Sequence, residues 1–379
     1  MKKVFKIFLV FGFSVLISGI CSGQNKGDDV VIGKYDKIFS EVLDEERTLL
    51  VSVPEGFDHS NVKYPVLYVL DGYESSFVSA VADIARIQYE ISPIILVAIA
   101  NTNRNRDMIP DNEAQKFLEF MTSELFPYIE KKYRADNYRI LYGGSNAGLF
   151  VLYSFLENPD SFSSYIASSP TIGWSYDTIV NKTKTFSNKQ SHLNKFLYII
   201  NGGRDDLDQV ITKFPEYIPM LEALKEKGLR LNISFLPDEE HVPFISLHSG
   251  LLSLFEGYTY PDGMRKKGGL DAVKAYYNRF SEKFGYEVKY PFSAIQGVGQ
   301  GLLFRDKNFK EAIEVLKLGI QQQPGLWVNN IMLALAYYKD NNMDQAKKYY
   351  LKAAEIDPEN EPPPFPEFKE MKEKFKKYH

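Results

Sequence analysis

Cysteine is nearly absent from this sequence, which holds one such residue, Cys21, among 379. A single thiol cannot close an intrachain disulfide, so the fold must depend on its apolar core, which a chain of this length can build. No cysteine cluster and no H-E-x-x-H motif occurs, and we expect neither a metal nor another cofactor. Histidine is limited to five residues, so a site that needs an imidazole has few candidates.

An excess of positive charge is also missing. The formal net charge is −4, which argues against nucleic-acid binding as the main task. The hydrophobic fraction of 44% and the charged fraction of 25% are those of a soluble globular protein. The length suggests two domains.

The first residues are typical of an export signal. A basic start, Met1–Lys3, precedes the apolar run Ile7–Ile20 and the small, polar stretch Cys21–Gln24. The run is short for a stable membrane span, so we expect no transmembrane helix in the mature chain. We predict a signal peptide over residues 1–23 and a periplasmic or extracellular protein. Lipidation of Cys21 is the alternative, although Ile20 before it is bulkier than lipoprotein processing prefers.

Residues 30–260 alternate between strand-like and helix-like segments. Apolar stretches such as Tyr64–Gly72, Ile94–Asn101 and Phe196–Gly202 are separated by helical patterns such as Lys116–Tyr133. Near-continuous apolar strands between helices indicate a mostly parallel sheet that is covered on both faces. We therefore predict an α/β domain with a doubly wound sheet.

The remaining chain has a helical pattern with an internal repeat. Residues 261–269 are predicted to be a linker, and 270–358 a helical module. Within it, Asn308–Pro324 and Asn342–Pro358 align at an offset of 34 positions, the period of the tetratricopeptide repeat. Two repeats are few for independent stability, so we expect support from the helix at 270–284 or from the sheet domain. The proline-rich and then basic tail, 359–379, is expected to be unstructured.

The stretch YRILYGGSNAGLFVLYSF, Tyr138–Phe155, has a strand pattern, two glycines and then an apolar helical pattern. Ser145 lies at the junction, where a sharp turn exposes its hydroxyl at the start of a helix. The usual elbow is G-x-S-x-G, and Ala147 stands here in place of the second glycine. This arrangement predicts a nucleophile that attacks a carbonyl group.

A serine hydroxyl needs a base, and in a hydrolase sheet the order along the chain is serine, acid, histidine. Asp205 and Asp206 follow the strand Phe196–Gly202, and spacing leaves both open as the acid. His241 follows the last strong strand and is the candidate base.

The oxyanion formed during attack needs two N–H donors. We expect them to be the backbone of Asn146, directly after the nucleophile, and that of Tyr73, after the strand at 64–70.

Further along the chain, Arg104 or Arg106 could hold an acidic substrate, or pair with Asp107 instead. Trp174 is expected to form a pocket wall.

Five stretches, in this order, resemble the esterase family of α/β-hydrolases: YPVLYVLDG, IANTNRNRDMIP, YRILYGGSNAGLFVLYSFLENPDSF, IASSPTIGW and EEHVPFISLHSGLLSLF. The family includes enterochelin-type siderophore esterases, feruloyl and acetyl-xylan esterases, and S-formylglutathione hydrolase. The resemblance covers residues 35–258 and implies Ser145 as nucleophile and His241 as base. Members with a signal peptide and a C-terminal tetratricopeptide segment are familiar. This chain departs from the family pattern at Gly144, at Ala147 and at Val242, where the family often has histidine, glycine and glycine.

The sequence thus predicts an exported serine hydrolase that cleaves a small-molecule or carbohydrate ester through an acyl-enzyme. One alternative is an inactive hydrolase fold whose repeats bind a protein partner, and another is an acyltransferase. The acyl and alcohol parts of the substrate do not follow from the sequence.

Overall fold

The computed structural model describes residues 30–60, 62–357 and 366–375. The predicted signal peptide, Cys21 included, and residues 359–365 and 376–379 of the predicted tail lie outside these residues. Within the described ranges, no helix is both long and apolar enough to cross a membrane.

One eight-stranded sheet organises the first part of the chain, in the order β1-β2-β4-β3-β5-β6-β7-β8. The pairs β1–β2 and β2–β4 are antiparallel, and all the others are parallel. The strands are β1 (Lys34–Ser40), β2 (Glu45–Ser52), β3 (Tyr64–Val69), β4 (Ile95–Ile99), β5 (Ala135–Gly144), β6 (Ser164–Ser168), β7 (Phe196–Gly202) and β8 (Arg230–Leu236). The predicted doubly wound, mostly parallel sheet is confirmed.

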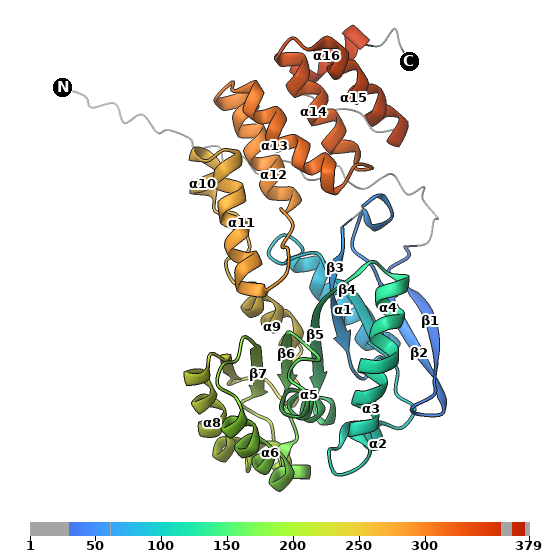
Figure 1. Ribbon diagram of the computed structural model, residues 1–379, viewed down its shortest axis with the longest axis vertical. Helices are drawn as coiled ribbons and strands as arrows, with labels where there is room; N and C mark the ends of the chain where they lie inside the picture. The colour runs from blue at the N-terminus through green and yellow to red at the C-terminus, as the bar shows by residue number, and fades with distance from the viewer. Residues whose placement is uncertain (1–29, 61, 358–365, 376–379) are drawn as a thin grey trace, which may run out of the picture.

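Helices cover both faces of this sheet (Figure 1). They are α1 (Glu74–Ile87), α2 (Arg104–Met108), α3 (Ala114–Phe120), α4 (Phe126–Lys132), α5 (Asn146–Glu157), α6 (Tyr176–Lys189), α7 (Asp208–Ile211), α8 (Phe214–Glu222) and α9 (Ser246–Leu254). Short turns of 3₁₀ or π-helix lie at η1 (Phe57–His59), η2 (Met121–Leu125), η3 (Ile172–Ser175) and η4 (Ala223–Lys227).

Alternate residues of the central strands face two different cores. Val66 and Tyr68 of β3 pack with α3 to α6 and α8, whereas Leu67 and Val69 pack with α1 and α9. Because side chains alternate along a strand, a strand that is buried on both faces must be apolar at every position, and all six residues of β3 are buried. The sheet therefore forms a rigid base for the loops at its edges.

The core on the α1 and α9 face continues into the C-terminal helices. These are α10 (Asp262–Lys267), α11 (Leu270–Phe284), α12 (Phe292–Gln300), α13 (Phe309–Gln322), α14 (Trp327–Lys339), α15 (Met343–Ile356) and α16 (Pro366–Phe375), with a π-helical turn, η5 (Gly301–Arg305), after α12. Helix α11 lies between the sheet and the other helices of this part (Figure 1). Its Tyr277 hydroxyl donates to the carbonyl of Tyr258, 3.0 Å away.

The 34-residue repeat has a structural counterpart. Asn308 caps α13 and Asn342 caps α15, each accepting a hydrogen bond from the N–H three residues later. Ala312 and Ala346 are fully buried at equivalent positions. Small residues there let neighbouring helices pack closely.

Two segments differ from the expectation. The predicted linker contains α10, and the predicted unstructured tail contains α16. In α16, Phe368, Met371 and Phe375 lie on one helical face and are buried, and the Phe375 ring packs near Tyr350 with centroids 5.5 Å apart. This apolar stripe provides the tertiary contacts that a short helix needs. The preceding prolines obscured it in the sequence.

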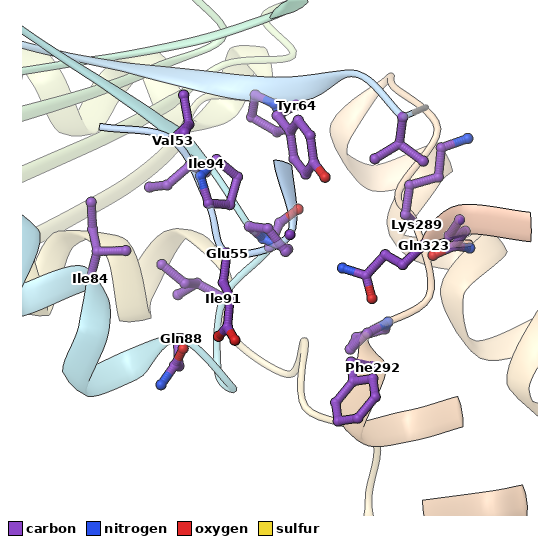
Figure 2. A pocket seen from close by; sticks show the side chains of 18 of the residues that line it. Val53, Glu55, Tyr64, Ile84, Gln88, Ile91, Ile94, Lys289, Phe292 and Gln323 are labelled. Atoms are coloured by element: carbon purple, nitrogen blue, oxygen red, sulfur yellow. The ribbon is translucent and has the colours of Figure 1, made fainter. Parts of the chain in front are cut away.

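A pocket of about 290 Å³ lies between the sheet domain and the C-terminal helices (Figure 2). Tyr64 and Ile94 line it from the sheet side, and Lys289, Phe292 and Gln323 from the helical side. None of the predicted site residues lines this pocket.

Candidate active site

Ser145 lies at the turn between β5 and α5, with a backbone φ of 60° and ψ of −124°. An L-residue rarely adopts such a conformation, and it persists only where its surroundings impose it. The Ser145 N–H donates to the carbonyl of Ser168 at 2.9 Å, which ties the turn to the end of β6. The strained turn holds the hydroxyl at the carboxyl edge of the sheet.

Two glycines allow this turn to pack. A Cβ at residue 143 would lie 2.8 Å from the Cβ of Ala147, and a Cβ at residue 144 would lie 2.7 Å from Cγ1 of Val242. The second contact shows that the loop carrying His241 lies directly against the turn that carries Ser145. The structure therefore places Gly144 and Val242, the chain neighbours of Ser145 and His241, against each other.

His241 and Asp205 form a pair at the carboxyl ends of β7 and β8. Nδ1 of His241 lies 2.9 Å from Oδ2 of Asp205, whose side chain is fully buried. The other oxygen of Asp205 accepts from the N–H of Leu207, so the carboxylate is held at both oxygens. Asp206 is exposed. Nε2 of His241 is buried and has no hydrogen-bond partner among the described residues.

Three buried serines hold the loop that carries His241. Ser169 Oγ accepts from the N–H of Val242 at 3.1 Å, and Ser168 Oγ lies 2.7 Å from Ser246 Oγ. Val242 and Ser169 both have positive φ, 54° and 39°. A backbone held in this way limits the positions that the imidazole can take.

The two expected oxyanion donors differ in their surroundings. Asn146 is the first residue of α5, where the N–H groups have no partner within the helix. Its side chain is held by Asn105 and Thr171. The N–H of Tyr73 donates to the carbonyl of Asp71 at 2.8 Å, so it is already engaged in a three-residue turn.

Both candidate arginines form ion pairs within the chain. Arg104 makes two hydrogen bonds to Asp71, at 2.7 and 2.9 Å, and approaches the carbonyl of Gly144 at 3.4 Å. Arg106 pairs with Glu45 and Asp107, both at 2.7 Å. These contacts favour a structural role for Arg106, whereas Arg104 lies beside the nucleophile turn.

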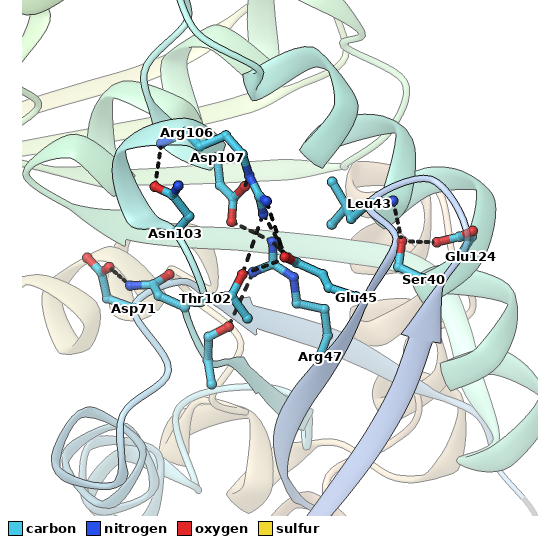
Figure 3. Close-up of polar contacts among 12 residues, drawn as sticks. Ser40, Leu43, Glu45, Arg47, Asp71, Thr102, Asn103, Arg106, Asp107 and Glu124 are labelled. Atoms are coloured by element: carbon cyan, nitrogen blue, oxygen red, sulfur yellow. Dashed lines mark hydrogen bonds and ion pairs between the residues drawn. The ribbon is translucent and has the colours of Figure 1, made fainter.

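Arg106 belongs to a larger cluster of charges (Figure 3). Arg47 is fully buried, with its guanidinium 2.5 Å from Asp107 and 2.6 Å from Glu45. The hydrogen bond from Arg106 is the main cause that lowers the pKa of Glu45, to about 2. The sequence reasoning missed Arg47, because it falls within a strand pattern and has no local motif.

Three exposed aromatic residues are close in sequence to residues of the candidate site. Trp174 is 56% exposed, Tyr73 54% and Phe244 65%, although large aromatic side chains are usually mostly buried. Trp174 follows β6, Tyr73 follows β3 and Phe244 follows His241. All three are therefore close in sequence to residues of the candidate site. Phe244 was not singled out from the sequence, although its position three residues after His241 was a signal.

Metal binding has no evident support in the side-chain arrangement. Among the described residues, no group of three or more histidine, cysteine, aspartate or glutamate side chains could hold a metal ion.

Comparison with known proteins adds independent information. Residues 40–227 match a family described as "Putative esterase", and residues 329–360 match the tetratricopeptide repeat. The chain is 29% identical over 216 residues to the ferri-bacillibactin esterase BesA of Bacillus subtilis, covering 47% of this chain and 74% of that protein. It is 26% identical over 218 residues to the apo-salmochelin esterase of Escherichia coli, covering 48% and 66%.

Solved structures show the same fold. An IroE-like serine hydrolase from Shewanella oneidensis superposes with a TM-score of 0.66 at 24% identity, covering 76% of this chain and 98% of that one. An uncharacterised protein from Capnocytophaga ochracea superposes with a TM-score of 0.54 at 16% identity, covering 91% and 99%. The family match over residues 40–227 and the two esterase relatives together support an ester hydrolase of the α/β-hydrolase type, followed by a C-terminal tetratricopeptide repeat.

Proposed function

We propose that the protein hydrolyses a carboxylic ester through an acyl-enzyme on Ser145, with His241 as base and Asp205 as the acid that orients it. The observation that supports this most directly is the His241–Asp205 pair at 2.9 Å, on a loop that lies against the strained serine turn. Nε2 of His241 has no hydrogen-bond partner within the described part of the chain, and it is the atom that would take the proton of the Ser145 hydroxyl.

The reaction then has two steps. Ser145 Oγ attacks the ester carbonyl while Nε2 takes its proton, and the imidazolium returns this proton to the leaving alcohol. Water attacks the acyl-enzyme in the second step, with the same imidazole as base. Asp205 holds Nδ1–H and stabilises the transient positive charge, and its burial strengthens that interaction.

The oxyanion would be held at the start of α5. The N–H of Asn146 supplies one hydrogen bond, and the positive end of the helix dipole favours the negative charge. Tyr73 N–H would be the second donor, shared with the Asp71 carbonyl that it contacts in this structure. Arg104 would keep the Asp71 turn in place.

We propose that the substrate is a small-molecule ester with aromatic rings, of the siderophore type, rather than a carbohydrate ester. Two relatives are named as esterases of ferri-bacillibactin and apo-salmochelin. The exposed rings of Tyr73, Trp174 and Phe244 would stack on aromatic groups of such a substrate.

Labelling with a fluorophosphonate probe tests the nucleophile. We expect the wild type to be labelled at Ser145, and Ser145→Ala to lose both labelling and hydrolysis of p-nitrophenyl acetate, by about 10⁴-fold or more. A folded wild type that is not labelled would instead favour an inactive scaffold. Formation of a transfer product with an added alcohol or sugar, at the expense of hydrolysis, would favour an acyltransferase.

A panel of esters tests the substrate. We expect catecholate-siderophore esters to have higher kcat/KM than feruloyl or acetyl-sugar esters. Trp174→Ala should raise KM for the aromatic substrates and leave acetyl esters nearly unchanged. Equal kcat/KM across the panel would contradict the substrate proposal without affecting the labelling result.

We also propose export to the periplasm or the exterior, with removal of residues 1–23, and a protein partner for the repeats. Cell fractionation with mass spectrometry of the mature N-terminus tests export. A cytoplasmic chain that retains Met1–Lys3 would contradict it.

A further inference from the structure

A second pocket, of about 360 Å³, lies at the sheet edge opposite the candidate active site. Arg230, the first residue of β8, and Lys283, at the end of α11, both line it. His192 and Lys195 line it from the loop before β7. The pocket therefore brings basic side chains of the sheet and of the first long C-terminal helix to one place.

Two of the positive charges of this pocket, those of Arg230 and Lys283, lack a paired carboxylate among the described residues, although Asp160 also lines the pocket. Lys195 pairs with Asp160 at 3.1 Å, but neither Arg230 nor Lys283 forms an ion pair with any described residue. Nε of Arg230 is buried without a hydrogen-bond partner among the described residues, and the Tyr138 hydroxyl is the one acceptor beside this guanidinium that the structure indicates. Burial lowers the pKa of Arg230, and burial together with the nearby Arg230 lowers the pKa of Lys283. Glu256 favours the charged form of Lys283 only from a distance.

Aromatic rings hold both cations. The Arg230 guanidinium lies 5.1 Å from the centroid of Phe196 and 5.6 Å from that of Phe284. Nζ of Lys283 lies 5.4 Å from the same Phe284 ring. These contacts fix the positions of the cations, but ring faces satisfy few of the eight N–H donors that the two groups carry together.

We infer that this pocket binds a small oxyanion, a phosphate or carboxylate group, between Arg230 and Lys283. The planar guanidinium suits two-point contact with an oxyanion, and the ammonium adds a point charge. The anion supplies acceptors in addition to the Tyr138 hydroxyl and offsets the repulsion between the two cations. Because one cation belongs to β8 and the other to α11, the bound anion also links the sheet to the C-terminal helices.

Isothermal titration calorimetry on the full chain tests this, with inorganic phosphate and citrate as probes and chloride used to keep the ionic strength constant. We expect saturable binding of at least one probe by the wild type. Arg230→Gln and Lys283→Gln should each weaken it about tenfold or more, because each removes a charged hydrogen-bond donor. Arg279→Gln, on an exposed position of α11 outside the pocket, is the matched control and should bind as the wild type does.

A variant with a reversed charge at residue 283 distinguishes loss of anion binding from loss of folding. Lys283→Glu places a carboxylate beside Arg230, so the variant should lose anion binding while its Tm in phosphate-free buffer rises or stays equal. Hydrolysis of p-nitrophenyl acetate should be unchanged in this variant. Absence of saturable binding to both probes, or equal binding by the wild type and all pocket variants, would overturn the inference.

Discussion

Asp205 and Asp206 are adjacent in the chain but have different surroundings. Only Asp205 contacts His241, and it is buried, whereas Asp206 is exposed. We expect Asp205→Asn to lower kcat by about 10³–10⁴-fold, because an amide cannot hold the imidazole in the required tautomer. Asp206→Asn, the matched control, should stay within about twofold, as surface changes usually do. Steady-state kinetics on p-nitrophenyl acetate measures both, and equal losses would contradict the assignment.

Gly144 and Val242 are a second pair with a testable coupling. A Cβ at residue 144 would lie 2.7 Å from Cγ1 of Val242, so Gly144→Ala must displace the residue next to His241. We expect a loss of about tenfold or more in kcat/KM, since small shifts of a catalytic group are costly. Val242→Ala should restore much of this loss in the double variant. If the two changes add independently, the contact does not position His241.

This contact also gives a physical reason for two departures from the family pattern. A larger residue at 144 and glycine at 242 is the arrangement that the family often has, and here the small and the large residue are exchanged. The sequence showed both departures but could not show that they meet, because residues 144 and 242 are far apart in the chain. The choice between Asp205 and Asp206 was open for the same reason: spacing does not say which carboxylate points inward.

At the level of elements, an ion pair between Arg106 and Glu45 joins helix α2 to strand β2. Glu45 of β2 accepts hydrogen bonds from Arg106 of α2, which lower its pKa to about 2 from the usual 4.5. A carboxylate with a depressed pKa stabilises the fold above pH 4.5, and this contribution is lost as the pH falls toward 2.

We therefore expect Glu45→Gln to lower the free energy of unfolding by about 1–3 kcal/mol at pH 6, and the difference from the wild type to vanish near pH 2. Urea unfolding at several pH values measures this. Glu46→Gln changes the next residue, which pairs with Lys37 on the surface, and should have an effect below about 0.5 kcal/mol. A difference for Glu45→Gln that does not vary with pH would exclude the charge as its cause.

Elements with a strong apolar pattern could be predicted from the sequence, and elements that depend on tertiary contacts could not. The strand Phe196–Gly202 was predicted with the bounds of β7, and the helix at 270–284 was predicted with the bounds of α11. Strand β1 was missed because Tyr35 and Phe39 are exposed at the sheet edge and its pattern mixes charges with aromatic residues. Helix α16 was missed because its stability comes from packing against α14 and α15.

At the level of the whole molecule, α11 joins the sheet domain to the other C-terminal helices, at the end of the sheet away from the candidate active site (Figure 1). Its Tyr276 and Tyr277 hydroxyls bind backbone carbonyls at 257–259, so this helix is fixed to the sheet domain. We expect a chain that ends at residue 289 to keep its kcat/KM within about twofold and to have a lower Tm, because the core shared with α12 and α13 is lost.

Kinetics and thermal unfolding of this shortened chain measure both effects. A chain that ends at residue 365, and therefore lacks only α16, is the control for a general effect of truncation. Complete loss of ester hydrolysis in a folded chain that ends at residue 289 would show that the repeats complete the site.

The continuous core between the sheet and the C-terminal helices has a geometric consequence. A flexible hinge would let the repeats change their position relative to Ser145. A continuous packed core instead fixes the distance and direction of the repeats from Ser145. A protein partner bound by the repeats, as proposed above, would therefore be held at a set distance from the candidate active site.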